Sequence, residues 1–90
     1  MKITFDLIKR VKTLAQRSLD FARAGEIFEG HYFTLDGDRR EGGEPRNITV
    51  GKLDGGMVVM VWTPCEEETR IISMRAANER EHAKYGKLLD

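Results

Sequence analysis

The sequence predicts a small α+β domain in which a short strand and two helices precede an antiparallel sheet and a closing helix. Residues 7–30 repeat apolar side chains at three- and four-residue steps, as amphipathic helices do. Residues 47–75 instead alternate or run apolar, as strands do, and residues 78–81 carry a helix-start pattern. A chain of 90 residues has room for one domain, which we expect to span residues 1–90.

Composition and charge narrow the class of protein. Hydrophobic residues make up 40% of the chain, a fraction too high for a disordered protein. Charged residues make up 33% and break the chain into short apolar runs, so the sequence does not indicate a membrane protein. Fifteen basic and fifteen acidic residues give a net charge of zero. Bulk charge therefore does not favour a nucleic-acid partner, and only a local cluster of cations would do so.

The few metal-binding and redox residues point to a protein without cofactors. Cys65 is the single cysteine, so it closes no disulfide within the chain, and the two histidines do not complete a zinc site with it. We expect no metal and no other cofactor. Because the N-terminus lacks the continuous apolar run of a secretory signal, we expect a cytoplasmic protein with no membrane contact.

The first third of the chain is expected to hold a strand and two helices. Ile3 and Phe5 alternate with polar residues, and Asp6 is placed to cap a helix over residues 7–17. We expect the apolar stripe of that helix to face the core, with the basic and amide side chains in solvent. The stripe is Leu7, Ile8, Val11, Leu14 and Ala15, and the solvent side is Lys9, Lys12 and Gln16. Asp20 caps a second helix, with a stripe of Phe21, Ala24, Ile27 and Phe28 and a stop at Gly30.

The remaining two thirds predict three or four antiparallel strands and a last helix. The expected strands are 31–35, 48–50, 57–62 and 69–75, with a loop over 36–45 and an acidic turn over 64–68. Asp54-Gly55 indicates a tight hairpin, since both residues accept the positive φ that such a turn needs. Asn78 and Glu81 form a capping-box pattern for a helix over 79–88.

Three arginines are the most informative polar residues, because Arg46, Arg70 and Arg75 fall at strand ends. A guanidinium there can hold a phosphate through its planar fork, or it can simply keep a strand edge soluble. Spacing leaves both interpretations open.

The expected strand register limits how these arginines combine. With Leu53 opposite Gly56, Val50 faces Val59 and Arg46 faces Thr63. If Thr63 also faces Thr69, Arg70 lies opposite Trp62 and Arg75 opposite Met57, which separates Arg46 from Arg75 by about 20 Å. Arg46 and Arg70 then point to opposite faces unless a bulge intervenes. We expect Trp62 itself to belong to the core.

Several segments resemble the BrnT family of type II toxins. The tail RIISMRAANEREHAKY, residues 70–85, is similar to the family signature and is the most specific part of the match. The middle and the opening also resemble the family, so the likeness covers nearly the whole chain. The matching residues there are Asp38-Arg39, Gly43-Glu44, Arg46 and Gly51, and Phe5-Asp6, Lys9, Asp20-Phe21, Ala24 and Phe28.

The resemblance implies a RelE-like fold and a toxin that cleaves RNA, with mRNA as one candidate substrate, to stop translation and growth. It also implies a BrnA-type antitoxin as partner, with operator DNA bound through the antitoxin complex. The sequence departs from the family where N-x-x-K-H-G commonly precedes the second helix, since it has Thr13, Gln16, Arg17 and Ser18 there. The alternative is therefore a catalytically degenerate member that acts through its antitoxin complex and operator DNA.

Metal-free RNA cleavage needs a base for the 2′-hydroxyl, cations for the added phosphate charge and an acid for the leaving oxygen. We assign the phosphate charge to Arg46, Arg70 and Arg75, and the base to Glu44. We assign substrate binding to Arg80, Tyr85 and Arg17, with His82 or Arg17 as the acid.

Overall fold

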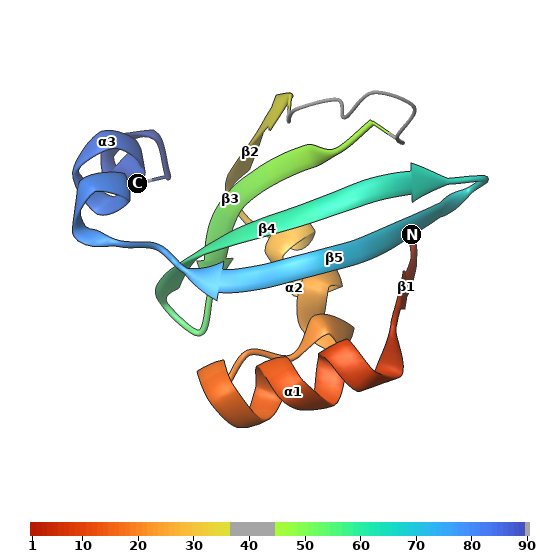
Figure 1. The fold of residues 1–90 in the computed structure, drawn as a ribbon. Helices are drawn as coiled ribbons and strands as arrows, with labels where there is room; N and C mark the ends of the chain where they lie inside the picture. The colour runs from red at the N-terminus through yellow and green to blue at the C-terminus, as the bar shows by residue number, and fades with distance from the viewer. Residues whose placement is uncertain (37–44, 90) are drawn as a thin grey trace.

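The computed structural model describes residues 1–36 and 45–89 and confirms the predicted α+β class. A sheet of strand order β1-β5-β4-β3-β2 carries helices on both faces (Figure 1). The described part of the sheet has five strands rather than three or four, because β1 joins β5 in parallel while the other pairs are antiparallel. In chain order the elements are β1 (Lys2–Phe5), α1 (Leu7–Arg17), the 3-10 helix η1 (Phe21–Arg23), α2 (Ala24–Glu29), β2 (Tyr32–Asp36), β3 (Asn47–Leu53), β4 (Gly56–Cys65), β5 (Glu68–Ala76) and α3 (Glu79–Leu89).

Two hydrophobic cores lie on opposite faces of the sheet, because successive side chains of a strand point to opposite sides. The larger core joins η1 and α2 to one face; its buried residues are Phe21, Ala24, Ile27, Leu53, Val58, Met60, Ile71 and Met74. The smaller core joins the end of α3 to the other face through Val50, Met57, Val59 and Leu89. None of the described helices is long and apolar enough to cross a membrane.

The predicted caps at Asp6 and Asp20 are found, but Asp20 caps the 3-10 helix η1, so α2 begins only at Ala24. The Asp6 carboxylate accepts the backbone N–H groups of Ile8 and Lys9 at 2.8 and 3.2 Å, and Asp20 accepts that of Ala22 at 2.9 Å. These bonds satisfy N–H groups that a helix leaves without partners at its first turn. The capping box of α3 is described below with the site to which it belongs.

The predicted orientation of α1 is wrong. Its apolar stripe points to solvent: Leu7, Ile8, Val11 and Leu14 are 65%, 80%, 64% and 43% exposed. Polar contacts hold the helix in place instead, because Arg10 pairs with Asp20 at 2.7 Å and Arg17 Nη1 donates to the Met74 carbonyl at 3.0 Å. Periodicity shows which side of a helix is apolar, but it does not show whether the same chain supplies the cover.

The register of the β3–β4 hairpin is confirmed, and the register of β4–β5 is wrong. Leu53 pairs with Gly56 and Val50 with Val59, around a turn in which Asp54 and Gly55 both have positive φ. Between β4 and β5 the turn is shorter than expected, since Cys65 already pairs with Glu68. The expected Thr63–Thr69, Trp62–Arg70 and Met57–Arg75 pairs are replaced by Thr63–Arg70, Trp62–Ile71 and Val59–Arg75.

A β-bulge causes the second half of that shift. Val61 pairs with Ser73 while the next residue of β4, Trp62, pairs with Ile71, so Ile72 is an extra residue in β5. Trp62 packs beside the larger core, as expected, and its Nε1 donates to Thr49 Oγ1 at 2.7 Å.

Candidate functional site

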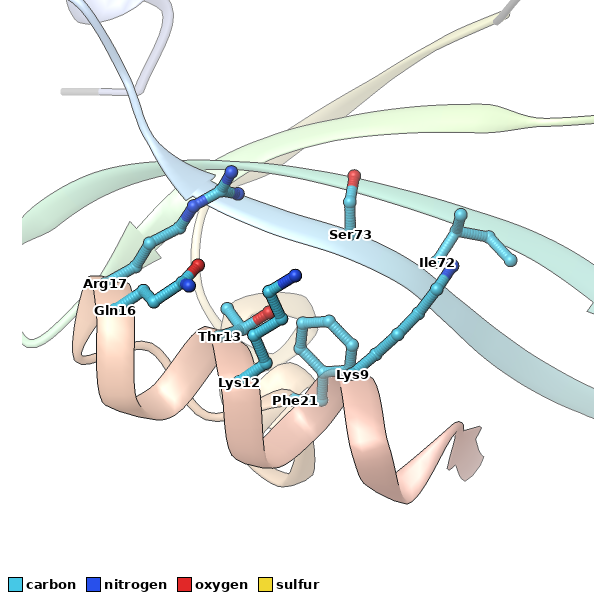
Figure 2. Close-up of a pocket in the computed structure, with 8 residues that line it drawn as sticks. All are labelled: Lys9, Lys12, Thr13, Gln16, Arg17, Phe21, Ile72 and Ser73. Carbon is cyan, nitrogen blue, oxygen red and sulfur yellow. The ribbon is translucent and has the colours of Figure 1, made fainter.

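A basic groove lies between α1 and β5. It has a volume of about 300 Å³, and its walls are Lys9, Lys12, Thr13, Gln16, Arg17, Phe21, Ile72 and Ser73. Figure 2 shows the side chains of Lys9, Lys12 and Arg17 rising from α1 toward β5. These lining residues include three cations and, within the described ranges, no carboxylate. Such a surface attracts an anion.

The groove exists because β1 pairs with only the first part of β5 and leaves the edge of its second part open. β1 pairs with residues 68–71 and then turns into α1 at Asp6. From Ile72 onward, no strand in the described part of the chain pairs with this side of β5. Arg17 satisfies one open acceptor of the edge through its bond to the Met74 carbonyl. The polar side of α1 therefore lies along an open strand edge.

The bulge places Arg70 and Arg75 on the same face of the sheet. In a regular strand, residues five positions apart point to opposite faces. Here Arg70 lies opposite Thr63 and Arg75 opposite Val59, and these partners are four positions apart along β4. Both guanidinium groups therefore start from the face that carries α3, about 13 Å apart at the usual strand rise.

Arg75 is held by Glu81 at the start of α3. Its Nη1 and Nη2 donate to Oε1 and Oε2 of that carboxylate at 2.7 and 2.8 Å. Glu81 Oε1 also accepts the Asn78 backbone N–H at 3.0 Å, while Asn78 Oδ1 accepts the Glu81 N–H at 2.8 Å, so the predicted capping box is confirmed. The bonds from Arg75 and from the Asn78 N–H lower the pKa of Glu81 to about 2. Glu81 is therefore anionic at neutral pH and a weak base.

The groove and Arg75 meet at one strand edge. The Met74 carbonyl holds Arg17, and Arg75 is the next residue along β5. Met74 is buried in the larger core and Arg75 faces the other side, so the two arginines lie on either side of the same edge. An extended anion that crosses this edge can contact both.

A family model for the ribonuclease toxin BrnT of type II toxin–antitoxin systems matches residues 5–81. The chain belongs to this family. A comparison with curated proteins found no match. The matched range contains the whole basic groove, Arg70 and Arg75, and it ends at Glu81, so His82 and Tyr85 lie beyond it.

The departure from the BrnT pattern falls in the basic groove. Thr13, Gln16, Arg17 and Ser18 stand where the family pattern has N-x-x-K-H-G, and the first three of them line the groove. The neighbouring lysines Lys9 and Lys12 supply further positive charge there. Lys9 and Lys12 are exposed, as predicted, and they also line this groove. The signal that could have marked the groove is the lack of any acidic residue in α1.

The other predicted site residues lie at several places. Arg46 is half-buried just before β3, where Thr63 Oγ1 donates to the Pro45 carbonyl at 2.7 Å. Arg70 is exposed on the strand position opposite Thr63. Glu44, the predicted base, lies outside the described residues, as does most of the predicted loop 36–45.

The C-terminal helix carries the remaining predicted residues. Arg80 and His82 are exposed in its first half. Tyr85 is half-buried, with its ring centroid 5.0 Å from that of Phe33 and the Lys84 ammonium 5.4 Å from its own ring. Tyr85 thus joins α3 to the smaller core, and it does not line the basic groove.

Proposed function

We propose that this BrnT-family chain is a metal-independent endoribonuclease that binds RNA in the basic groove and across the adjacent edge of β5. One observation carries the proposal. The groove of a chain with zero net charge is lined by three cations and, among the described residues, by no carboxylate. Phosphate contacts of this kind supply most of the affinity of proteins for nucleic-acid backbones.

The arginines would stabilise the phosphate during cleavage. Arg75, Arg70 and Arg46 are proposed to hold the charge of successive phosphates, including the charge that develops during cleavage, with Arg17 binding the strand at the edge of β5. Arg80 and Tyr85 are proposed to position the substrate further along α3. This division fits the separation of about 13 Å between Arg70 and Arg75, since a single phosphate does not span it.

Acid and base are assigned by chemistry and position. Glu44 is proposed as the base, since the low pKa of Glu81 makes that carboxylate a poor substitute. A guanidinium gives up its proton reluctantly, so we favour His82 over Arg17 as the acid. His82 directly follows Glu81 in α3 and is exposed.

The partners follow from the family. A type II toxin implies an antitoxin, which we propose to be of the BrnA type, and operator DNA would be bound through that complex. The proposed site of action is the cytoplasm, where RNA and the antitoxin meet.

The alternative is a catalytically silent protein that acts through its antitoxin complex. The replacement of the K-H-G pattern by Gln16, Arg17 and Ser18 favours it, as does the engagement of Arg75 by Glu81.

Purified chain incubated with bulk RNA in the presence of a chelator separates the two functions. We expect fragments from the native chain, and strongly reduced cleavage from Arg17→Gln and from Arg75→Gln. Lys87→Gln removes an exposed cation from the last turn of α3 and serves as the control. Growth of cultures expressing each variant gives a second readout. If soluble native chain leaves RNA intact and growth normal, the alternative function is correct.

A further inference from the structure

The exposed apolar side of α1 is a second surface that the proposed catalysis does not use. Leu7, Ile8 and Val11 line a shallow hollow together with Lys12, and Leu14 continues the stripe. The helix buries none of its residues against the rest of the chain. Contiguous exposed aliphatic side chains of this kind mark sites of protein contact.

We propose that this apolar stripe, Leu7, Ile8, Val11 and Leu14, is where the antitoxin docks an amphipathic helix with acidic flanks, a proposal that rests on the proposed function. The charge of α1 selects the partner. The helix carries no acidic residue, and Lys12 lines the apolar hollow itself, so the stripe has a cationic border on the side of the basic groove. A helix with apolar residues at three- and four-residue steps and carboxylates beside them is complementary in both respects.

A second copy of the chain fits this surface poorly. Two α1 helices packed through their stripes would bring their cations together, and like charges across an interface are unfavourable. The area is also small, because 11 residues of helix span about 16 Å, whereas a stable interface uses about 20 to 30 residues a side. A longer partner can contact the stripe and continue beyond it.

Lys12 shows where such a partner would continue. This residue lines both the apolar hollow and the basic groove, so the two surfaces share one wall. An antitoxin helix on the stripe would place its acidic flank at Lys12 and so reach the entrance of the groove. Docking would then exclude RNA electrostatically and sterically, without contact to Arg75.

Affinity of the chain for its purified BrnA-type antitoxin, measured by calorimetry with variants of Val11, tests the proposal. Val11→Glu and Val11→Lys both remove the apolar contact and keep good helix formers on an exposed position. We expect Val11→Glu to weaken binding by about a hundredfold and Val11→Lys by about tenfold, because the acidic flank repels the new carboxylate. Leu88→Glu, on an equally exposed leucine of α3, is the control and should change affinity by less than about threefold.

Three results would overturn the proposal. Unchanged affinity of both Val11 variants would place the antitoxin elsewhere. Equal losses of affinity from Val11→Glu and Val11→Lys would show that the antitoxin helix carries no acidic flank at this position. Sedimentation of the chain alone as a dimer that Val11→Glu dissociates, with antitoxin affinity retained, would make the stripe a contact between copies. RNA cleavage is measured separately, and Val11→Glu should retain it. A native chain that does not cleave RNA contradicts the proposed function, whereas unchanged antitoxin affinity of the Val11 variants contradicts only the docking proposal.

Discussion

The Arg75 guanidinium and the Glu81 carboxylate form a two-pronged ion pair, with N–O distances of 2.7 and 2.8 Å, that joins the last strand to the last helix. The same carboxylate accepts the Asn78 N–H that begins α3. An RNA phosphate that binds Arg75 must therefore compete with a carboxylate that also stabilises a helix end. If RNA binds Arg75 as proposed, its binding and the stability of α3 are coupled through this pair.

Glu81→Gln is expected to free Arg75 and weaken the start of α3. The free energy of unfolding should fall by about 1 kcal/mol, a modest value because the pair is partly exposed and solvent screens it. Affinity for a single-stranded RNA should rise, since the phosphate no longer displaces a carboxylate. Urea unfolding and fluorescence anisotropy measure the two effects. Glu79→Gln, also in the first turn of α3, is the matched control; an equal rise in RNA affinity there would show that general charge explains the effect.

Stability is expected to fall on acidification between about pH 4.5 and 2. The pKa of Asp20 is lowered to about 2 from an ordinary 3.8, chiefly by the bond from Arg10, and that of Glu81 to about 2 from 4.5, chiefly by the bond from Arg75. Because both pKa values are lower in the folded chain, their contribution is complete above the unfolded values and is lost as the folded groups take up protons. Urea midpoints across this range provide the measurement. In Glu81→Gln the loss should be smaller, and an identical pH profile would rule out Glu81 as a contributor.

The basic groove should show itself in the salt dependence of RNA binding. Each cation that contacts a phosphate adds about 0.7 to the slope of log affinity against log salt for a single strand. Lys12→Gln and Arg17→Gln should each lower that slope by about this amount, measured with a 2′-O-methyl RNA that cannot be cleaved. Lys87→Gln should leave the slope unchanged. A slope that responds to Lys87 and not to Lys12 would place the RNA on α3.

Gly51→Ala is expected to destabilise the fold, because α2 packs directly over this strand position. A Cβ built on Gly51 would lie 2.5 Å from Ile27 Cγ2 and 3.2 Å from Tyr32 Cβ. Ile27 is fully buried, so relief requires α2 to shift, at a cost of about 1 to 3 kcal/mol. Thermal unfolding measures the loss. The same change at Gly30, where a Cβ meets nothing within 4 Å, is the control and should have a smaller effect.

Locally encoded features could be predicted from the sequence. The caps at Asp6 and Asn78 and the Asp54-Gly55 turn depend on residues within a few positions of each other, and each is found where it was expected. The class of the domain followed from the same short-range patterns. These features need no knowledge of distant partners.

Features that depend on distant segments could not be predicted. The orientation of α1 is set by Arg10 with Asp20 and by Arg17 with Met74, the second of which joins residues 57 positions apart. The basic groove requires that β1 end opposite Ile71, and no local pattern marks that point. The placement of Arg70 and Arg75 on one face likewise needed the register that the bulge creates.

The bulge at Ile72 also determines how this chain tolerates changes in length. Loss of one residue between Arg70 and Arg75 would remove the extra position in β5 and leave the two arginines four positions apart in a regular strand, where both still point to the same face. Most single substitutions in the same stretch would leave the direction of both side chains intact. In related chains that keep both arginines on one face, we therefore expect either four residues between them with a bulge, or three residues in a regular strand.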